Sequence, residues 1–354
     1  MDMKRLTFIS VLAMLLMAAC SKPEPAPTPE QFEKYIFFSH NVDTKAPLIG
    51  SAADMNGKQF GVVGYNYDTS SEWATVKSAA TPLVFAANPQ AVTCDANGYG
   101  TYSPLKGWSN SKKYTFFAFY PMINDATDDY VSLVNLDGST YTAGVPAIKY
   151  HLDPSNASDF KTSMFDVMTA THQVDKYWRS ASDHNIANGE VTMEFAHRLS
   201  SLGVNVKNSS AGAIQVQGIF MDIAGIQYQQ IILPLDGTTA TMSADAFDID
   251  LYSLSVADAS SLASGTDKEL SDKLILIPQA SQISIELTVV FKRKFGENAA
   301  SDLITSGPFS LSTVLTAGNK HLISLNFKDE TVEVEGEVST EGWIDMPDVE
   351  DTFN

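Results

Sequence analysis

Few residues in this sequence have the types and spacing that catalysis or metal binding requires. His151 and Asp153 stand two positions apart and His172 and Asp175 stand three apart, so each pair could offer two ligands, but neither spacing is that of a known metal site. The aspartates between residues 125 and 129 could bind calcium, yet their spacing differs from that of an EF-hand loop. The G-x-S-x-G, H-E-x-x-H, P-loop and G-x-G-x-x-G motifs are missing from the sequence. We therefore expect no catalytic residue, no metal ligand and no cofactor.

The elements that would have to position any such site are β-strands. Apolar and polar residues alternate along the segment 283–292, which is typical of a strand with one buried face. Similar strand patterns mark the segments 114–120, 214–220, 273–277 and 321–327, and turn signals such as Asn97-Gly98 and Asp137-Gly138 separate the strands. Helical periodicity is confined to two short stretches, 159–170 and 257–265. This pattern predicts an all-β fold built from sandwiches.

The N-terminus predicts export and a lipid anchor. Lys4 and Arg5 precede an apolar run, residues 6–17, that is too short to span a bilayer stably. Cys20 directly follows two alanines, an arrangement that resembles the lipobox of bacterial lipoproteins, so we expect residues 1–19 to be a signal peptide and Cys20 to carry the lipid. The alternative is an ordinary signal peptide with a chance cysteine. Residues 20–34 are rich in proline and predict an extended tether.

Charge and cysteine content narrow the classes of partner. The 354-residue chain has a formal net charge of −19, which argues against nucleic acid and anionic lipid because both would be repelled. Once Cys20 is acylated, Cys94 is the remaining cysteine, so no disulfide within the chain is expected. A polar, turn-rich stretch near 182–189 suggests two units, residues 35–188 and residues 189–354, the second with an acidic tail.

Several motifs in order along the chain resemble one family. The segment 191–206, V-T-M-E-F-A-H-R-L-S-S-L-G-V-N-V, is similar to an F-x-H-x-L element of the fimbrillin superfamily, the type V pilins and Mfa-like lipoproteins of Bacteroidales. Its apolar parity changes between Leu199 and Leu202, which predicts a bulge or bend, with His197 facing inward and bonded to backbone. Further resemblances are Y-I-F-F at 35–38, F-G-V-V-G-Y at 60–65, A-F-Y-P at 118–121, D-V-M-T-A at 166–170, L-I-P-Q at 276–279 and T-A-G-N-K-H-L at 316–322, with Trp343 as the terminal tryptophan.

The resemblance implies two tandem transthyretin-like β-sandwich domains and a structural or adhesive role in a fimbrium, not an enzymatic one. In this family a lipoprotein precursor at the outer membrane loses its first strand to a trypsin-like protease, and a strand of the next subunit fills the groove. The scissile bond would be Lys45–Ala46 here. The displaced first strand would include Tyr35, Ile36, Phe37, Phe38 and Val42, which are apolar on both parities, as in a strand covered on both faces. A first strand that stays in place in an uncleaved lipoprotein is the alternative.

The partners implied are other fimbrial subunits, the outer membrane before processing, and a host or bacterial surface ligand. Val332, Val334 and Val338 alternate with glutamates, so this segment could donate a strand to a neighbour or pair within its own sheet, and tip and shaft roles both stay open. Two other classes remain as alternatives. A surface glycan-binding lipoprotein would use tryptophans such as Trp73 and Trp108 as a platform, and a secreted β-sandwich hydrolase would need paired carboxylates in a cleft.

Overall fold

Strands dominate the computed structural model of the chain, as the alternating sequence predicts. The structure describes residues 35–42, 53–82, 84–124, 129–155, 157–180, 182–186, 190–294, 302–329, 331–334 and 338–342. The expected strands at 114–120, 214–220, 273–277, 283–292 and 321–327 are present. The helical stretches shrink to α4 (Ala157–Ser163) and to a 3-10 turn, η3 (Ala257–Ala259). Among the described residues no helix is both long and apolar enough to cross a membrane.

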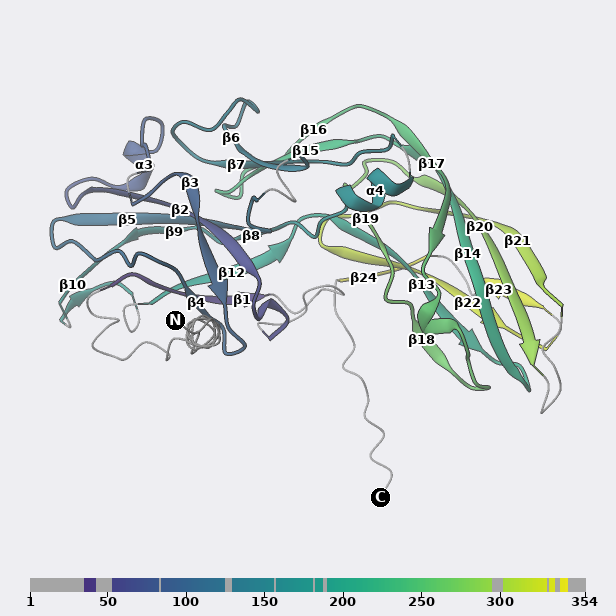
Figure 1. Cartoon of the computed structure of the whole chain (residues 1–354). Helices are drawn as coiled ribbons and strands as arrows, with labels where there is room; N and C mark the ends of the chain where they lie inside the picture. The colour runs from purple at the N-terminus through teal and green to yellow at the C-terminus, as the bar shows by residue number, and fades with distance from the viewer. Residues whose placement is uncertain are drawn as a thin grey trace, which may run out of the picture.

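The N-terminal unit is built on one eight-stranded sheet that closes on itself (Figure 1). Its strand order is β2 (Gln59–Asp68), β3 (Phe85–Cys94), β4 (Tyr99–Thr101), β1 (Phe37–Val42), β12 (Glu190–His197), β8 (Met168–Ala170), β5 (Lys112–Tyr120) and β9 (Gln173–Lys176). A further pairing of β2 with β5 closes the circuit. The strands enclose an aromatic-rich core that includes Phe38, Phe60, Phe116 and Phe195.

The C-terminal unit is a sandwich of two sheets, whose longest strands lie at the right of Figure 1. One sheet has the order β18 (Asp267–Glu269), β13 (Ser200–Asn208), β22 (Asn319–Phe327) and β23 (Val332–Val334), with β19 (Leu274–Leu276) on β13 and β24 (Ser339–Gly342) on β22. The facing sheet has the order β17 (Phe247–Leu254), β14 (Ala213–Ile226), β20 (Ile283–Lys294) and β21 (Ile304–Thr313). The expectation of tandem β-sandwiches is confirmed.

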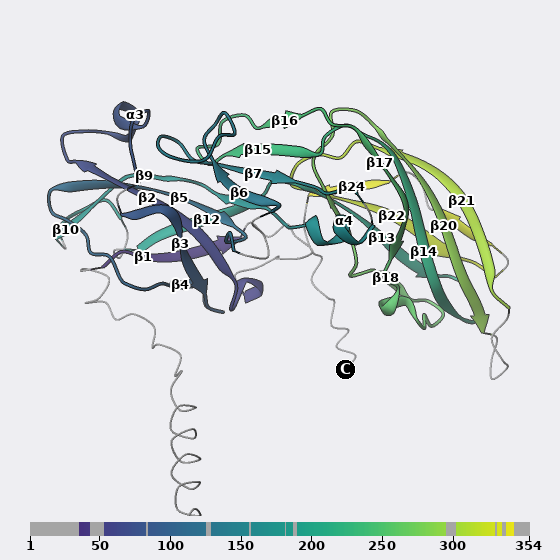
Figure 2. The same ribbon diagram turned by 45° about the horizontal axis from the view of Figure 1, so that its top comes forward.

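A further four-stranded sheet joins the two units. In it β6 (Val131–Val134) and β7 (Ala147–His151) pair with β15 (Gln230–Pro234) and β16 (Thr241–Ser243) in the order β16-β15-β7-β6, and Figure 2 shows this sheet running between the two sandwiches. A second hydrophobic core, which includes Tyr65, Phe117, Ile231 and Phe327, continues beneath it from one unit into the other.

The chain passes between the units later than its composition suggests. Strand β12 begins at Glu190, beyond the expected boundary at residue 188, yet it pairs with β1 and β8 of the N-terminal sheet. Strand β13 then starts at Ser200 in the C-terminal sandwich. The parity change between Leu199 and Leu202 therefore marks the place where the chain leaves one sheet and enters another.

Candidate functional site

The first strand lies in the middle of the N-terminal sheet, not at its edge. Strand β1 pairs in parallel with β12 over six residues, from Phe37 opposite Glu190 to Val42 opposite Phe195. On its other side it pairs antiparallel with β4, where Phe38 lies opposite Gly100. Tyr35 makes a bridge to Gly107 just before the strand. Removing β1 would leave backbone groups of both β12 and β4 without their strand partners.

The inward face of β1 fills a groove in the N-terminal core. Ile36, Phe38, His40 and Val42 alternate on this face, and none of them is more than 3% exposed. The ring of Phe38 lies against Phe85, Tyr102 and Phe116, with centroid separations of 5.9, 5.7 and 5.5 Å, and meets Phe116 edge to face. Such tilted and edge contacts add to the stabilisation that burial of the ring provides.

The outward face of β1 is covered at its start and open at its end. Phe37 is 7% exposed, whereas Ser39 is half-buried and Asn41 is exposed. The sequence indicates that the apolar positions are covered on both faces of the strand. On the outward face this cover is found at Phe37 and does not continue to Asn41.

The strand beside β1 is shaped to let the two backbones approach. A methyl group at Gly100 would lie 2.5 Å from Val92 and 3.4 Å from the carbonyl oxygen of Phe38, so glycine is required there. The Tyr102 hydroxyl donates a hydrogen bond of 2.7 Å to the carbonyl of Ile36. The turn before β4 contributes the Gly98 carbonyl, which accepts from the His40 amide at 2.8 Å.

His40 is a polar exception in this apolar groove, and sequence reasoning did not single it out. Its side chain is buried against the Phe60 ring, and neither ring nitrogen has a hydrogen-bond partner. Burial lowers the pKa of His40, and the nearby Asp95 opposes that shift only in part. The ring is therefore neutral at physiological pH. Its alternation with apolar neighbours was the signal that it faces inward.

Comparison with known proteins identifies the family of this chain and structures similar to it. Residues 44–343 match the model of the Fimbrillin-like family. The chain belongs to the Fimbrillin-like family. A fimbrial protein from Bacteroides vulgatus has a similar structure, with a TM-score of 0.59 at 19% identity over 87% of this chain and 99% of that chain. A proposed cell adhesion protein from Bacteroides ovatus gives a TM-score of 0.50 at 12% identity over 88% and 99% of the two chains. No curated protein sequence matches.

As a member of the Fimbrillin-like family, the chain is a structural protein and not an enzyme. The described residues contain no group of three or more histidine, cysteine or acidic side chains placed to hold a metal ion. His172 stacks on Phe117 while the Asp175 carboxylate accepts hydrogen bonds elsewhere, so this pair does not form. Burial raises the pKa of the Cys94 thiol to about 12, which keeps it protonated and unreactive.

His197 pairs with a carboxylate that the sequence does not indicate. Its Nδ1 lies 2.8 Å from the Oδ1 of Asp166, and both side chains are buried. The sequence suggests a backbone partner across the bend, and the structure brings the carboxylate of Asp166, just before β8, to the ring. Nothing in the spacing of the two residues, 31 positions apart, could have predicted this pair.

The tryptophans among the described residues of this fimbrillin-like protein pack within it and form no exposed platform. Trp73 lies in the second hydrophobic core against Tyr65, and Trp178 stacks on His184 at a centroid separation of 4.2 Å. Trp108 is half-buried and meets Tyr114 edge to face. The sugar platform suggested by the sequence is therefore not assembled from these residues.

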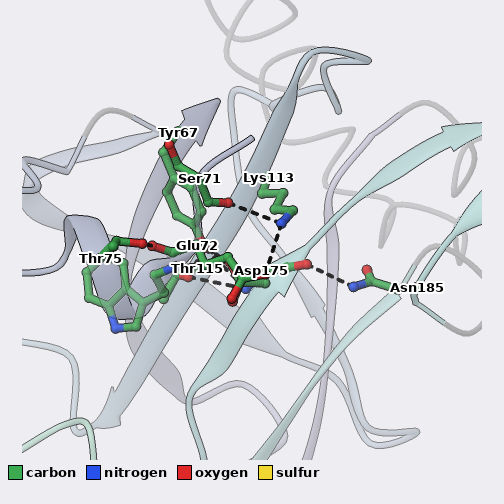
Figure 3. A network of polar contacts seen from close by, with 9 residues as sticks. Tyr67, Ser71, Glu72, Thr75, Lys113, Thr115, Asp175 and Asn185 are labelled. Atoms are coloured by element: carbon green, nitrogen blue, oxygen red, sulfur yellow. Dashed lines mark hydrogen bonds and ion pairs between the residues drawn. The ribbon is translucent and has the colours of Figure 1, made fainter. Parts of the chain in front are cut away.

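A polar network anchors β9 to the rim of the N-terminal unit (Figure 3). The Tyr67 hydroxyl lies 2.8 Å from the Oδ1 of Asp175 and 2.7 Å from Thr115, and the backbone amide of Trp73 donates to the same Oδ1 at 3.0 Å. Burial raises the pKa of Tyr67, which keeps its hydroxyl proton available. The Asn185 amide donates to the Asp175 carbonyl, so the network also fixes the hairpin of β10 (Trp178–Ser180) and β11 (Asp183–His184). Its role is structural.

The C-terminal strands lie along the outer edge of β22. Strand β23 pairs with Leu325–Phe327 and β24 with Asn319–Leu322. Val332 is buried, while Val334 and Val338 are half-buried against the second hydrophobic core. Cys20, Lys45, Ala46 and Trp343 lie outside the described residues.

Proposed function

We propose that this chain is exported as a lipoprotein and becomes a subunit of a type V fimbrium by strand exchange after its first strand is removed. The observation that supports this proposal most is the position of β1 within the N-terminal sheet. A single six-residue strand closes both β4 and β12 and fills an apolar groove, and it is the first strand of the fold. A subunit that lost it would need another strand in its place.

The anchor and the removable strand lie on the same side of the proposed cleavage point. Cys20, which we expect to carry the lipid, and β1 both precede Lys45. Pro47 is one residue beyond the Lys45–Ala46 bond, so it does not block a trypsin-like protease at that bond. A single cut at this bond would therefore release the subunit from the outer membrane and at the same time allow β1 to leave its groove.

Limited proteolysis of the folded full-length protein tests the processing step. Trypsin is expected to produce a new N-terminus at Ala46, and the released strand is expected to exchange with a labelled peptide of sequence 35–42. The control is Lys45→Gln, which should block both cleavage and exchange. A chain that stays intact at Lys45, or that is cut but never exchanges its first strand, would favour an anchor-like or non-fimbrial lipoprotein.

The lipid anchor has its own test in cells. Cys20→Ser should abolish acyl labelling and leave a mislocalised precursor. Cys94→Ser is the matched control, because this buried thiol lies within the folded unit and should not affect labelling. Unchanged labelling and membrane fractionation of the Cys20→Ser protein would contradict lipidation at this residue.

A further inference from the structure

The groove beneath β1 contains a pocket shaped for one aromatic ring. Phe38 is 1% exposed and is enclosed by Phe85, Tyr102 and Phe116. The other inward positions, at residues 36, 40 and 42, carry uncharged side chains that are also buried. A strand that replaces β1 must therefore present an aromatic residue at the pocket and uncharged residues two positions to either side.

The chain's own C-terminal strands do not meet this requirement. As one extended strand, the segment 331–342 would carry Val332, Val334, Gly336 and Val338 on one face and mainly glutamates on the other. No aromatic residue occurs in the segment, so the pocket would receive at most a valine whichever way the strand runs. The space that the Phe38 ring occupies would then be left as a cavity, which is destabilising.

The residues beyond this segment fit no better. Trp343 and Phe353 are the aromatic residues that follow it. Side chains on one face of a strand recur every two residues, so Trp343 would bring Glu341 and Asp345 into the groove, and Phe353 would bring Asp351. Burying an unpaired carboxylate among the rings around Phe38 is strongly unfavourable.

Charge on the outer face of the groove also argues against the C-terminal segment as the strand that replaces β1. Phe37 and Asn41 of β1 lie opposite Glu190 and Glu194 of β12. If the segment 332–338 took the place of β1, the glutamates between its valines would lie beside these two acidic residues. Like charges directly opposite each other on neighbouring strands destabilise the pair.

We propose that the groove of this chain accepts a strand from a different protein, with an aromatic residue for the Phe38 pocket and neutral or basic residues beside Glu190 and Glu194. Residues 331–354 of another copy are therefore not the strand that fills this groove. The inference rests on the proposed function, since the groove opens only when β1 leaves. It places the chain where two kinds of subunit meet in a fimbrium, rather than in a run of identical subunits.

Peptide capture by the trypsin-cleaved full-length protein tests the inference. The first pair of probes is the first-strand peptide 35–42 and its Phe38→Val version. The second pair is the C-terminal peptide 331–343 and a version carrying Glu333→Lys, Val334→Phe and Glu335→Lys. The first-strand peptide is expected to be retained, its Phe38→Val version at least 10-fold more weakly, and the native C-terminal peptide at least 100-fold more weakly, with the redesigned version recovering most of that loss.

The outcomes separate this inference from the proposed function. Retention of the native C-terminal peptide as tightly as the first-strand peptide, or self-assembly of the cleaved protein, would overturn the inference and leave strand exchange intact. Equal retention of the first-strand peptide and its Phe38→Val version would also overturn it. If fully cleaved protein retains none of the four peptides, no groove has opened and the proposed function fails as well.

Discussion

Replacing Phe38 with valine should destabilise the protein at its first strand. The expected loss is larger than any single contact of the Phe38 ring would account for. Truncating a buried phenylalanine to alanine costs about 3–5 kcal/mol of unfolding free energy, and valine restores roughly two methyl groups at about 0.8 kcal/mol each. Each aromatic pair contributes about 0.5–1.5 kcal/mol, and Phe38 makes such contacts with three rings. Allowing for overlap between these effects, we expect Phe38→Val to lower the free energy of unfolding by about 2–4 kcal/mol.

Two measurements on the uncleaved protein check this value. Urea unfolding should show a lower midpoint with an unchanged slope, because the surface exposed on unfolding hardly changes. Hydrogen exchange should show faster exchange of the amides of β1, including that of His40, by about 30- to 700-fold if the strand opens locally, since each 1.4 kcal/mol is a factor of ten.

The matched control is Phe309→Val, the same chemical change at a half-buried position in the edge strand β21. It should cost less than about 1.5 kcal/mol, because a partly exposed ring gives up less buried surface. A Phe38→Val protein that is no less stable than the control, or whose β1 amides exchange at the wild-type rate, would refute the claim that this ring holds the strand in its groove.

Three further predictions concern buried polarity and backbone strain. His40→Leu should raise stability by about 1–2 kcal/mol because it removes unpaired ring nitrogens. It should also flatten the loss of stability below pH 6.5, since the folded state lowers the His40 pKa from 6.5 and the unfolded chain therefore binds the proton first as pH falls; equal slopes in urea unfolding at pH 5–7 would contradict this. Leu251, 68% exposed with φ of 48°, should gain about 0.5–1 kcal/mol on replacement by asparagine, measured by thermal unfolding, because asparagine tolerates that backbone conformation. Asp175→Ala should cost about 2–3 kcal/mol in urea unfolding and Asp175→Asn less than about 1, because the amide keeps an oxygen that accepts from Tyr67 and Trp73; similar losses for both would exclude the network as the cause.

The sequence predicts the local features of the candidate site better than its surroundings. Alternation alone identifies Ile36, Phe38 and Val42 as one face of a strand, because side-chain direction repeats every two residues. The partner strands are not predictable in this way. Strand β12 lies about 150 residues further along the chain, and its parallel pairing with β1 is decided by packing in the folded state.

The contrast between local pattern and long-range pairing also explains the other differences between the sequence-based predictions and the structure. The polar stretch near residue 188 suggests a boundary, but β12 completes the first sheet because it is the strand that covers the edge of β1. The pair of His197 with Asp166 and the network around Asp175 join residues that have no characteristic spacing. Composition also gives no sign that β7 and β15, from different units, share a sheet.

That shared sheet has a mechanical consequence for a protein that is pulled from its two ends. Among the described residues, the five-residue antiparallel pairing of β7 with β15 and the core that continues beneath it connect the two sandwiches directly. Tension applied at the groove of the first unit therefore reaches the second through hydrogen bonds and packed side chains together, not through one extended linker. A strand lying along β12 in the groove would be loaded along its length, so that its ladder bonds resist in concert instead of peeling apart one by one. If the chain assembles into a fimbrium as proposed, it would transmit force as a single stiff body.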